Sequence, residues 1–346
     1  DLSKAAGTSW ALGTNYFKVS LPVDSTLSAT TATGLINFSA VLDNAGNATQ
    51  MYMGDLHGNL WKLDFSQVAD STHWNIDELS SFNKGTVASP APYPMYIAKD
   101  ASGNVQPISA APNLAAGPDS DTAYVVFGTG KYLEVSDRGS SSAQTAYMLY
   151  DNGSTSGDAS PVGDSAISGR ARLQGGATLN TTTGLVTVPA FTVGRATSSS
   201  STIRSGWYFD FPLTKERQIY SGTINQSTVN FNSLIPAATG TTGTCSASGG
   251  DGKGYSIKIA TGSGTIIDSS VGILGEPILI VDESQTTYTA TNSSGQRIKT
   301  EVSRIMQQGS DGLRDTGKTQ IQSYKVGRLN WRQINNYQDQ KNKVWP

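Results

Sequence analysis

MYMGDLHGNLWKLDF, residues 51–65, is the stretch that decides the fold of this chain. Apolar and polar residues alternate on either side of a centre that contains two glycines. Gly54 and Gly58 can supply the positive φ that a tight reversal requires, and Asp55 and Asn59 can form hydrogen bonds with the turn backbone. The stretch therefore predicts a β-hairpin with its turn at 54–59.

The second arm of this hairpin has the period of two that is typical of a strand. Trp61 and Leu63 fall on one face of the arm, while Leu60, Lys62 and Asp64 fall on the other. We expect Trp61 to be a core residue that holds neighbouring sheets together.

Two further stretches repeat this layout in a weaker form. TAYVVFGTGKYLEVSD, residues 122–137, predicts a second hairpin with Gly128 and Gly130 as turn residues. GYSIKIATGSGTIID, residues 254–268, keeps the strand and the Gly-containing turn. Repeated antiparallel hairpins favour the blades of a β-propeller. Other alternating apolar runs predict further strands at 202–209, 255–259 and 320–326.

Composition supports an all-β fold and excludes some functions. Only 15% of the 346 residues are charged, while 37 are Gly, as in a chain of many strands and turns. The formal net charge of −2 gives no global signal for nucleic-acid binding. We expect residues 1–346 to be part of one propeller domain with a basic C-terminal segment at 297–346. That segment is either a docking surface for an acidic partner or a solvated face.

The cysteine content and the apolar runs limit which disulfides and which membrane associations are possible for this chain. Cys245 is the single cysteine, so an internal disulfide is impossible, and its thiol is either free or paired elsewhere. No export signal opens the sequence at Asp1, which predicts a mature form or a fragment. The most apolar stretch, 271–281, contains Glu276 and is too short to span a bilayer. We expect a secreted protein, peripheral to a membrane at most.

The hairpin at 51–65 resembles a motif in the carboxy-terminal propeller of the PilC/PilY family of type IV pilus tip proteins. The matching residues are Tyr52, Gly54, Asp55, Leu56, Gly58, Asn59, Leu60, Trp61, Lys62 and Asp64. Further matches follow in the family's order, at 125–137, Gln144, Tyr147, Asp151, 206–208, Asp210, Pro212, Glu216, Arg217, Phe231, 234–236, Cys245 and 327–332. The last of these places Trp331 as an anchor near the end of the sequence.

This resemblance implies a fold, a role and a location. The fold would be a β-propeller with an incomplete set of blades. The role would be non-enzymatic: promoting assembly and extension of the pilus (fimbrium), opposing its retraction, and adhering to host cells in virulence. The implied partners are major and minor pilin subunits and the host surface. The implied location is the cell surface, at the pilus tip or the outer membrane.

The same family often carries a Ca²⁺ loop just before this hairpin. Calcium takes about six to eight oxygen ligands. In the corresponding stretch VLDNAGNATQ, residues 41–50, Asp43 is kept, and Asn47 and Thr49 could add oxygens, but the other family carboxylates are absent. Ca²⁺ is the one cofactor that the resemblance suggests. The alternative is a hairpin turn whose Asp and Asn side chains satisfy local backbone groups.

A nucleotide-binding motif occurs in the sequence without its context. Residues 312–319, GLRDTGKT, satisfy the phosphate-loop pattern. A phosphate loop needs a buried strand before it and a helix after it, whereas QIQSYKV at 320–326 alternates like a strand. We therefore expect no nucleotide binding.

Catalytic residues are scarce. We expect His57 to be solvated in the hairpin turn and His73 to lie in a loop, and neither accompanies a nucleophile motif. Two propeller alternatives stay open. One is an enzyme, either a quinoprotein dehydrogenase or a hydrolase, and the other is a glycan-binding module.

Overall fold

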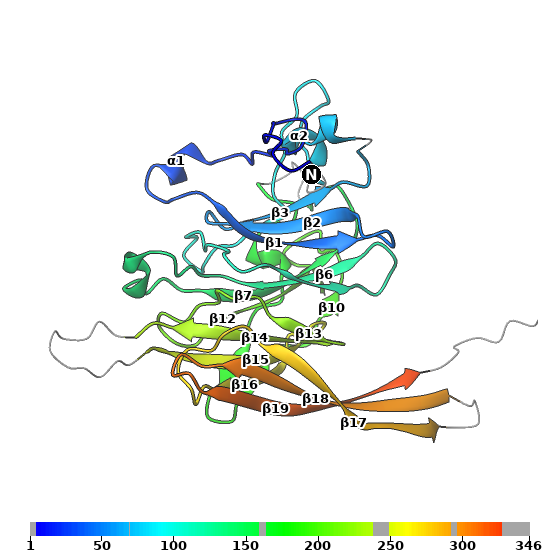
Figure 1. Cartoon of the computed structure of the whole chain (residues 1–346). Coiled ribbons are helices and arrows are strands. Elements are labelled where there is room, and N and C mark those ends of the chain that lie inside the picture. The colour runs from blue at the N-terminus through cyan, green and yellow to red at the C-terminus, as the bar shows by residue number, and fades with distance from the viewer. Residues whose placement is uncertain (1–4, 69, 159–163, 238–248, 292–295, 327–346) are drawn as a thin grey trace, which may run out of the picture. The chain divides into compact units, whose positions relative to one another are not determined.

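The computed structural model describes residues 5–68, 70–158, 164–237, 249–291 and 296–326. Strands dominate these residues, and the helices are short (Figure 1). The chain divides into two compact units, one of residues 1–278 with 307–315 and the other of residues 279–306 with 316–346. None of the helices in the described part has the length and apolar character to cross a membrane.

Three antiparallel sheets build the first unit. The first sheet contains β1 (Leu35–Leu42), β2 (Ala48–Asp55), β3 (Asn59–Asp64) and β4 (Tyr96–Ile97), in that order. The second has the order β12-β7-β6-β5 and contains β5 (Asn113–Ala116), β6 (Ala123–Gly128), β7 (Thr145–Asp151) and β12 (Gly206–Asp210). The third has the order β13-β14-β15-β16-β9-β8 and contains β8 (Thr178–Asn180), β9 (Leu185–Thr187), β13 (Thr223–Asn225), β14 (Thr228–Ile235), β15 (Asp251–Lys258) and β16 (Gly264–Asp268).

The remaining elements are small or form a separate sheet. A parallel pair consists of β10 (Thr192–Val193) and β11 (Ile203–Arg204). A three-stranded sheet contains β17 (Ile278–Thr291), β18 (Gln296–Gln308) and β19 (Arg314–Val326), in that order. The short helices are α1 (Ser25–Ser28), η1 (Ser71–His73), α2 (Ile76–Leu79), η2 (Val135–Arg138) and η3 (Arg170–Arg172).

The three sheets of the first unit stack face to face because their strands are apolar on both sides (Figure 1). On β6, Val125 and Phe127 pack in the cluster shared with the first sheet. Val126, between them, packs in the cluster shared with the third sheet. This period of two continues on β7, where Tyr147 faces the first sheet and Met148 the third. The stacked sheets are the blades of the predicted all-β propeller.

The sequence located most strands correctly. Residues 51–65 form the β2–β3 hairpin, and residues 254–268 lie in the β15–β16 hairpin. The runs at 202–209, 255–259 and 320–326 all overlap observed strands. The hairpin predicted at 122–137 is wrong, because β6 is followed by a loop and by η2 and pairs instead with β5 and β7.

Gly54 has a different role from the predicted one. It is a strand residue of β2 and does not adopt positive φ. A Cβ atom at this position would overlap the side chain of Ile108. Gly54 is therefore required for close approach of the chain after β4, while Gly58 alone makes the reversal, with φ of 80°.

Candidate functional site: the Asp55 turn and the buried charges between sheets

The turn of the β2–β3 hairpin is organised by one buried carboxylate. Asp55 is 8% exposed. Its Oδ1 accepts hydrogen bonds from the backbone N–H groups of His57 at 3.0 Å and Asn59 at 2.9 Å. Its Oδ2 accepts from Asn59 Nδ2 at 2.9 Å and from the indole of Trp61 at 3.1 Å. Four donors therefore compensate the burial of this charge.

The same five-residue turn occurs three times in the described chain. Asp43–Asn47, Asp55–Asn59 and Asp100–Asn104 all read D-x-x-G-N. In each, one aspartate oxygen accepts two backbone N–H groups and the other accepts the amide of the asparagine. The glycines have φ of 86°, 80° and 87°. The recurrence is visible in the sequence itself as three D-x-x-G-N stretches.

The turn geometry bears on the suggested calcium loop. Asp43 accepts from Ala45 N at 2.8 Å, Asn47 N at 2.8 Å and Asn47 Nδ2 at 3.0 Å, and these bonds lower the pKa of Asp43, that from the Asn47 side chain most. The Thr49 hydroxyl donates to Val41 O at 3.1 Å, across the β1–β2 pair. The structure thus brings Asp43 and Asn47 together and keeps Thr49 in the strand pairing. These bonds are those expected of the alternative, a self-satisfied hairpin turn, and calcium binding stays a prediction.

Two glycines of this repeated turn provide a matched test. Gly58→Ala is expected to destabilise the protein by about 2–4 kcal/mol, because a left-handed φ costs an L-residue about 1–2 kcal/mol and crowding adds to it. A Cβ at Gly58 would lie 2.7 Å from Gln106 O and 2.8 Å from Ala98 O. A Cβ at Gly46 would have no atom within 4 Å. Gly46→Ala is therefore expected to cost only the backbone strain of the left-handed φ. Urea denaturation measures both, and equal losses would contradict the close approach at Gly58.

A buried ion pair joins the first sheet to the second. Lys62 Nζ on β3 lies 2.6 Å from Asp151 Oδ2 on β7, with side chains 4% and 2% exposed. The Tyr52 hydroxyl on β2 donates to the same oxygen at 2.6 Å. Burial, and then the charge of Asp151, raise the pKa of Tyr52 well above its usual range. The alternation of residues 60–64 predicts the strand face of Lys62 but not its partner Asp151.

A second polar cluster lies at the other end of β7. Arg170 donates to Asp210 Oδ1 and Oδ2, at 2.8 and 3.1 Å, and to Thr145 Oγ1 at 2.6 Å. Its guanidinium lies 4.6 Å from the centre of the Tyr208 ring. The Tyr147 hydroxyl donates to Gln106 Oε1 at 2.8 Å, and burial raises the pKa of Tyr147 to about 12. Such interlocked bonds fix the relative positions of strands and loops.

Known proteins that this chain is similar to are named type IV pilus biogenesis factors. A family described as "PilY1 beta-propeller domain" matches residues 27–185, which contain the first sheet and most of the second. A type IV pilus biogenesis factor PilY1 homolog of Xylella fastidiosa is 30% identical over 235 residues. Over these residues the chain resembles the PilC/PilY family. The predicted PilC/PilY resemblance and propeller fold are thus confirmed.

The alignment covers 66% of this chain but only 14% of the Xylella protein. PilY1 of Pseudomonas aeruginosa is 33% identical over 180 residues, which cover 48% of this chain and 15% of that protein. The crystal structure of the Pseudomonas aeruginosa PilY1 C-terminal domain superimposes with a TM-score of 0.49 and 23% identity, over 77% of this chain and 59% of that one. The chain therefore spans about one seventh of the length of these curated relatives.

Two other residues of the family motifs, Asp64 and Gly128, lie at the ends of strands. Asp64 accepts from Ser66 N and Oγ, at 2.8 and 2.6 Å, at the end of β3. Gly128 ends β6, and Gly130 follows it in a left-handed conformation against Arg217. Cys245 and Trp331 lie outside the described residues.

Glu216 and Arg217 of the family series are buried side by side, 1% and 3% exposed. Arg217 donates to the carbonyls of Lys131, Asp137, Ser140 and Lys215, at 2.7 to 3.0 Å. Glu216 Oε1 accepts from Ser233 Oγ at 2.6 Å and from the Tyr255 hydroxyl at 2.5 Å. Burial raises the pKa of Glu216.

This raised pKa predicts a pH dependence of stability. The folded state holds the Glu216 proton more tightly than the unfolded state, whose pKa is near the ordinary 4.5. The stabilisation from Glu216 is therefore complete below that ordinary pKa and is lost as pH rises through the raised folded value. We therefore expect the free energy of unfolding of the wild type, minus that of Glu216→Gln, to fall as pH rises over this range. Urea titrations at several pH values measure it. Glu276→Gln, at an exposed position, is the control, and parallel curves for the two variants would contradict the assignment.

Both histidines make contacts within the chain, and most of the phosphate-loop motif lies on a strand. The expectation that His57 is solvated is wrong: it is 4% exposed, and its Nε2 lies 3.2 Å from Thr31 O. His73 pairs with Glu78 at 2.5 Å. Residues 314–319 of the phosphate-loop pattern belong to strand β19. Within the described ranges, no group of three or more His, Cys, Asp or Glu side chains could hold a metal.

Proposed function

We propose that this propeller is a non-enzymatic module of a type IV pilus biogenesis factor, carried at the pilus tip or outer surface of a bacterium. In this role it promotes pilus assembly and extension, through contact with pilin subunits, and adhesion to host cells. Resemblance to the PilC/PilY family carries the proposal, because the curated relatives are named type IV pilus biogenesis factors.

The distribution of polar groups supports a binding and assembly role. The buried charges described above, at Asp55, Lys62, Asp151 and Glu216, are all engaged in bonds within or between sheets. In the described residues, neither histidine has a serine or cysteine partner within hydrogen-bond reach. Polar groups of this kind hold a scaffold rigid, as a surface for protein contacts requires.

Complementation of a deletion strain tests the assembly role. Bacteria that lack the parent gene are complemented with the full gene or with a gene from which the segment for residues 1–346 has been removed, and surface pili are counted by electron microscopy. We expect few pili without the propeller. Repeating the count in a strain that cannot retract pili separates assembly from retraction. Unchanged numbers in both backgrounds would contradict the proposal.

Adhesion and catalysis need their own measurements. Bacteria with the propeller are expected to bind host cells more than bacteria with equal numbers of pili and no propeller. The purified chain is expected to show no quinone absorbance and no turnover in a hydrolase screen. A bound quinone would replace the assembly role with the enzymatic alternative.

A further inference from the structure

An extended segment covers the outer face of the first sheet, the face turned away from the second sheet. Residues 17–23 cross this face without joining the sheet. Phe17, Val19 and Leu21 are half-buried, and the residues between them are exposed. Phe17 packs edge-on against Trp74 at 5.0 Å, and Trp74 against Phe65 at 5.7 Å. The segment is therefore anchored on the sheet by its apolar side.

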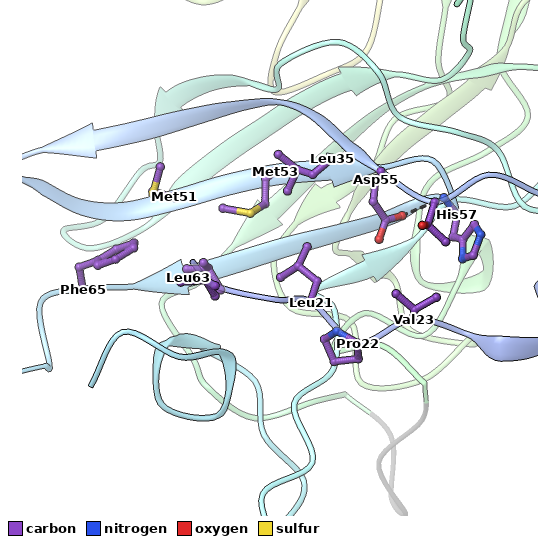
Figure 2. A pocket seen from close by; sticks show the side chains of 13 residues that line it. Leu21, Pro22, Val23, Leu35, Met51, Met53, Asp55, His57, Leu63 and Phe65 are labelled. Atoms are coloured by element: carbon purple, nitrogen blue, oxygen red, sulfur yellow. Dashed lines mark hydrogen bonds between the residues drawn. The ribbon is translucent and has the colours of Figure 1, made fainter. Parts of the chain in front are cut away.

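Between this segment and the sheet lies a cavity of about 410 Å³ (Figure 2). This volume falls in the range of small-molecule sites, about 300–1,000 Å³. The sheet side is apolar, with Met51 and Met53 on β2 and Leu63 on β3. The opposite wall is the segment itself, through Val19, Leu21 and Val23. Two flexible methionines allow the walls to adapt to apolar molecules of different shape.

One end of the cavity is polar and carries no cation. Its polar side chains are those of Asp55, His57 and Thr33. The Asp55 carboxylate lies at this end, and its oxygens accept from the four donors of the turn. Among the residues that the structure describes, neither Lys nor Arg lines the cavity. The charge at this end therefore favours a positive or neutral headgroup and disfavours an anion.

The buried His57 ring adds a hydrogen-bond acceptor. Thr31 O can only accept, so the ring Nε2 at 3.2 Å carries the proton. In the neutral imidazole, Nδ1 is then an acceptor, and no hydrogen bond to Nδ1 occurs among the described residues. His57 lines the cavity, so a headgroup that carries a donor can form a hydrogen bond with Nδ1.

We propose that this cavity binds a small amphiphile with an aliphatic body and a hydrogen-bond-donating headgroup, an ammonium or a hydroxyl. The body lies against Met51, Met53 and Leu63, and the headgroup lies at the His57 end. This site is independent of the proposed pilus function, because it requires no pilin or host cell.

Methionine methyl NMR on the full chain tests the proposal with internal controls. The probes are octylamine, n-octanol and octanoate, which share one chain length. Octylamine and n-octanol are expected to shift the Met51 and Met53 signals saturably. Met95 and Met148, buried in the other two clusters, are expected not to move. Octanoate is expected to bind at least about tenfold more weakly than octylamine and n-octanol.

Two leucine variants distinguish this cavity from general adsorption. Leu21→Trp fills the cavity and is expected to abolish the shifts. Leu133→Trp, at a position 54% exposed and outside the cavity lining, is expected to leave them unchanged. Unchanged Met95 and Met148 signals show that each variant is folded. His57→Phe keeps an aromatic ring without the acceptor, and we expect it to reduce the preference for n-octanol and octylamine over octanoate.

Several results would overturn the proposal. These are equal binding of octanoate, shifts that spread over all methionine signals, and binding that survives Leu21→Trp. The absence of any shift of the Met51 and Met53 signals with all three probes would also overturn it.

Discussion

Lys62→Met is expected to lower the free energy of unfolding by about 3–5 kcal/mol, because it leaves the Asp151 carboxylate buried without its cation. The pair lies 2.6 Å apart with both side chains almost fully buried. The Tyr52 hydroxyl and the Gly153 backbone N–H still donate to Asp151, but neutral donors do not replace a charge in a buried site. Urea denaturation followed by tryptophan fluorescence measures the loss.

A matched lysine and a double variant complete this experiment. Lys258 lies on strand β15 and is exposed, so Lys258→Met is expected to change stability by about 0.5 kcal/mol or less. Lys62→Met combined with Asp151→Asn removes both charges and is expected to cost less than the sum of the single changes. Similar losses for Lys62→Met and Lys258→Met would show that the ion pair does not hold the first two sheets together.

Local patterns predicted the hairpin at 51–65 correctly, since its register depends on residues within the hairpin itself. Met53 pairs with Trp61, and Gly54 with Leu60. The same logic failed at 122–137. Leu133 and Val135 alternate with polar residues there, but they are 54% and 94% exposed and cover no core. Alternation predicts a strand only when another surface is available to bury one of its faces.

Asp137 explains what forms in place of the second arm at 122–137. Its carboxylate accepts from the N–H groups of Leu133 and Glu134 and pairs with Lys131 at 2.6 Å. Side-chain bonds to nearby backbone groups compete with strand pairing. They turn this segment into a loop and a short helix.

Contacts between residues far apart in the sequence could not be predicted from local patterns. Gly54 was assigned to the turn because Ile108, which requires its small size, lies far along the chain. His57 was expected in solvent, yet the chain at Thr31 and at Gln106 covers its turn. A charge on a strand that is otherwise buried, such as Lys62, was the available signal for an inter-sheet pair. Its partner Asp151 follows only from the stacking of sheets.

Trp61→Ala is expected to destabilise the protein by about 3–5 kcal/mol, the range for removal of a large buried aromatic side chain. Trp61 is 2% exposed and packs with Met53, Leu63 and Leu79 on the outer face of the first sheet. The substitution also removes the indole N–H that donates to Asp55 at 3.1 Å. It therefore opens a cavity and leaves a buried carboxylate with one donor fewer. Thermal and urea denaturation measure the combined loss.

Trp61→Phe divides this loss between packing and hydrogen bonding. Phenylalanine keeps most of the apolar contact but cannot donate, so an intermediate loss of about 1.5–3 kcal/mol is expected, the range for one hydrogen bond to a charged group. Trp10→Ala removes an indole that is 56% exposed and is expected to cost less than either change at Trp61. If Trp61→Ala melted like the parent protein, Trp61 could not be a core residue of this blade. If Trp61→Phe cost as much as Trp61→Ala, the bond to Asp55, more than the packing of the indole, would fix the D-x-x-G-N turn to the face of the sheet.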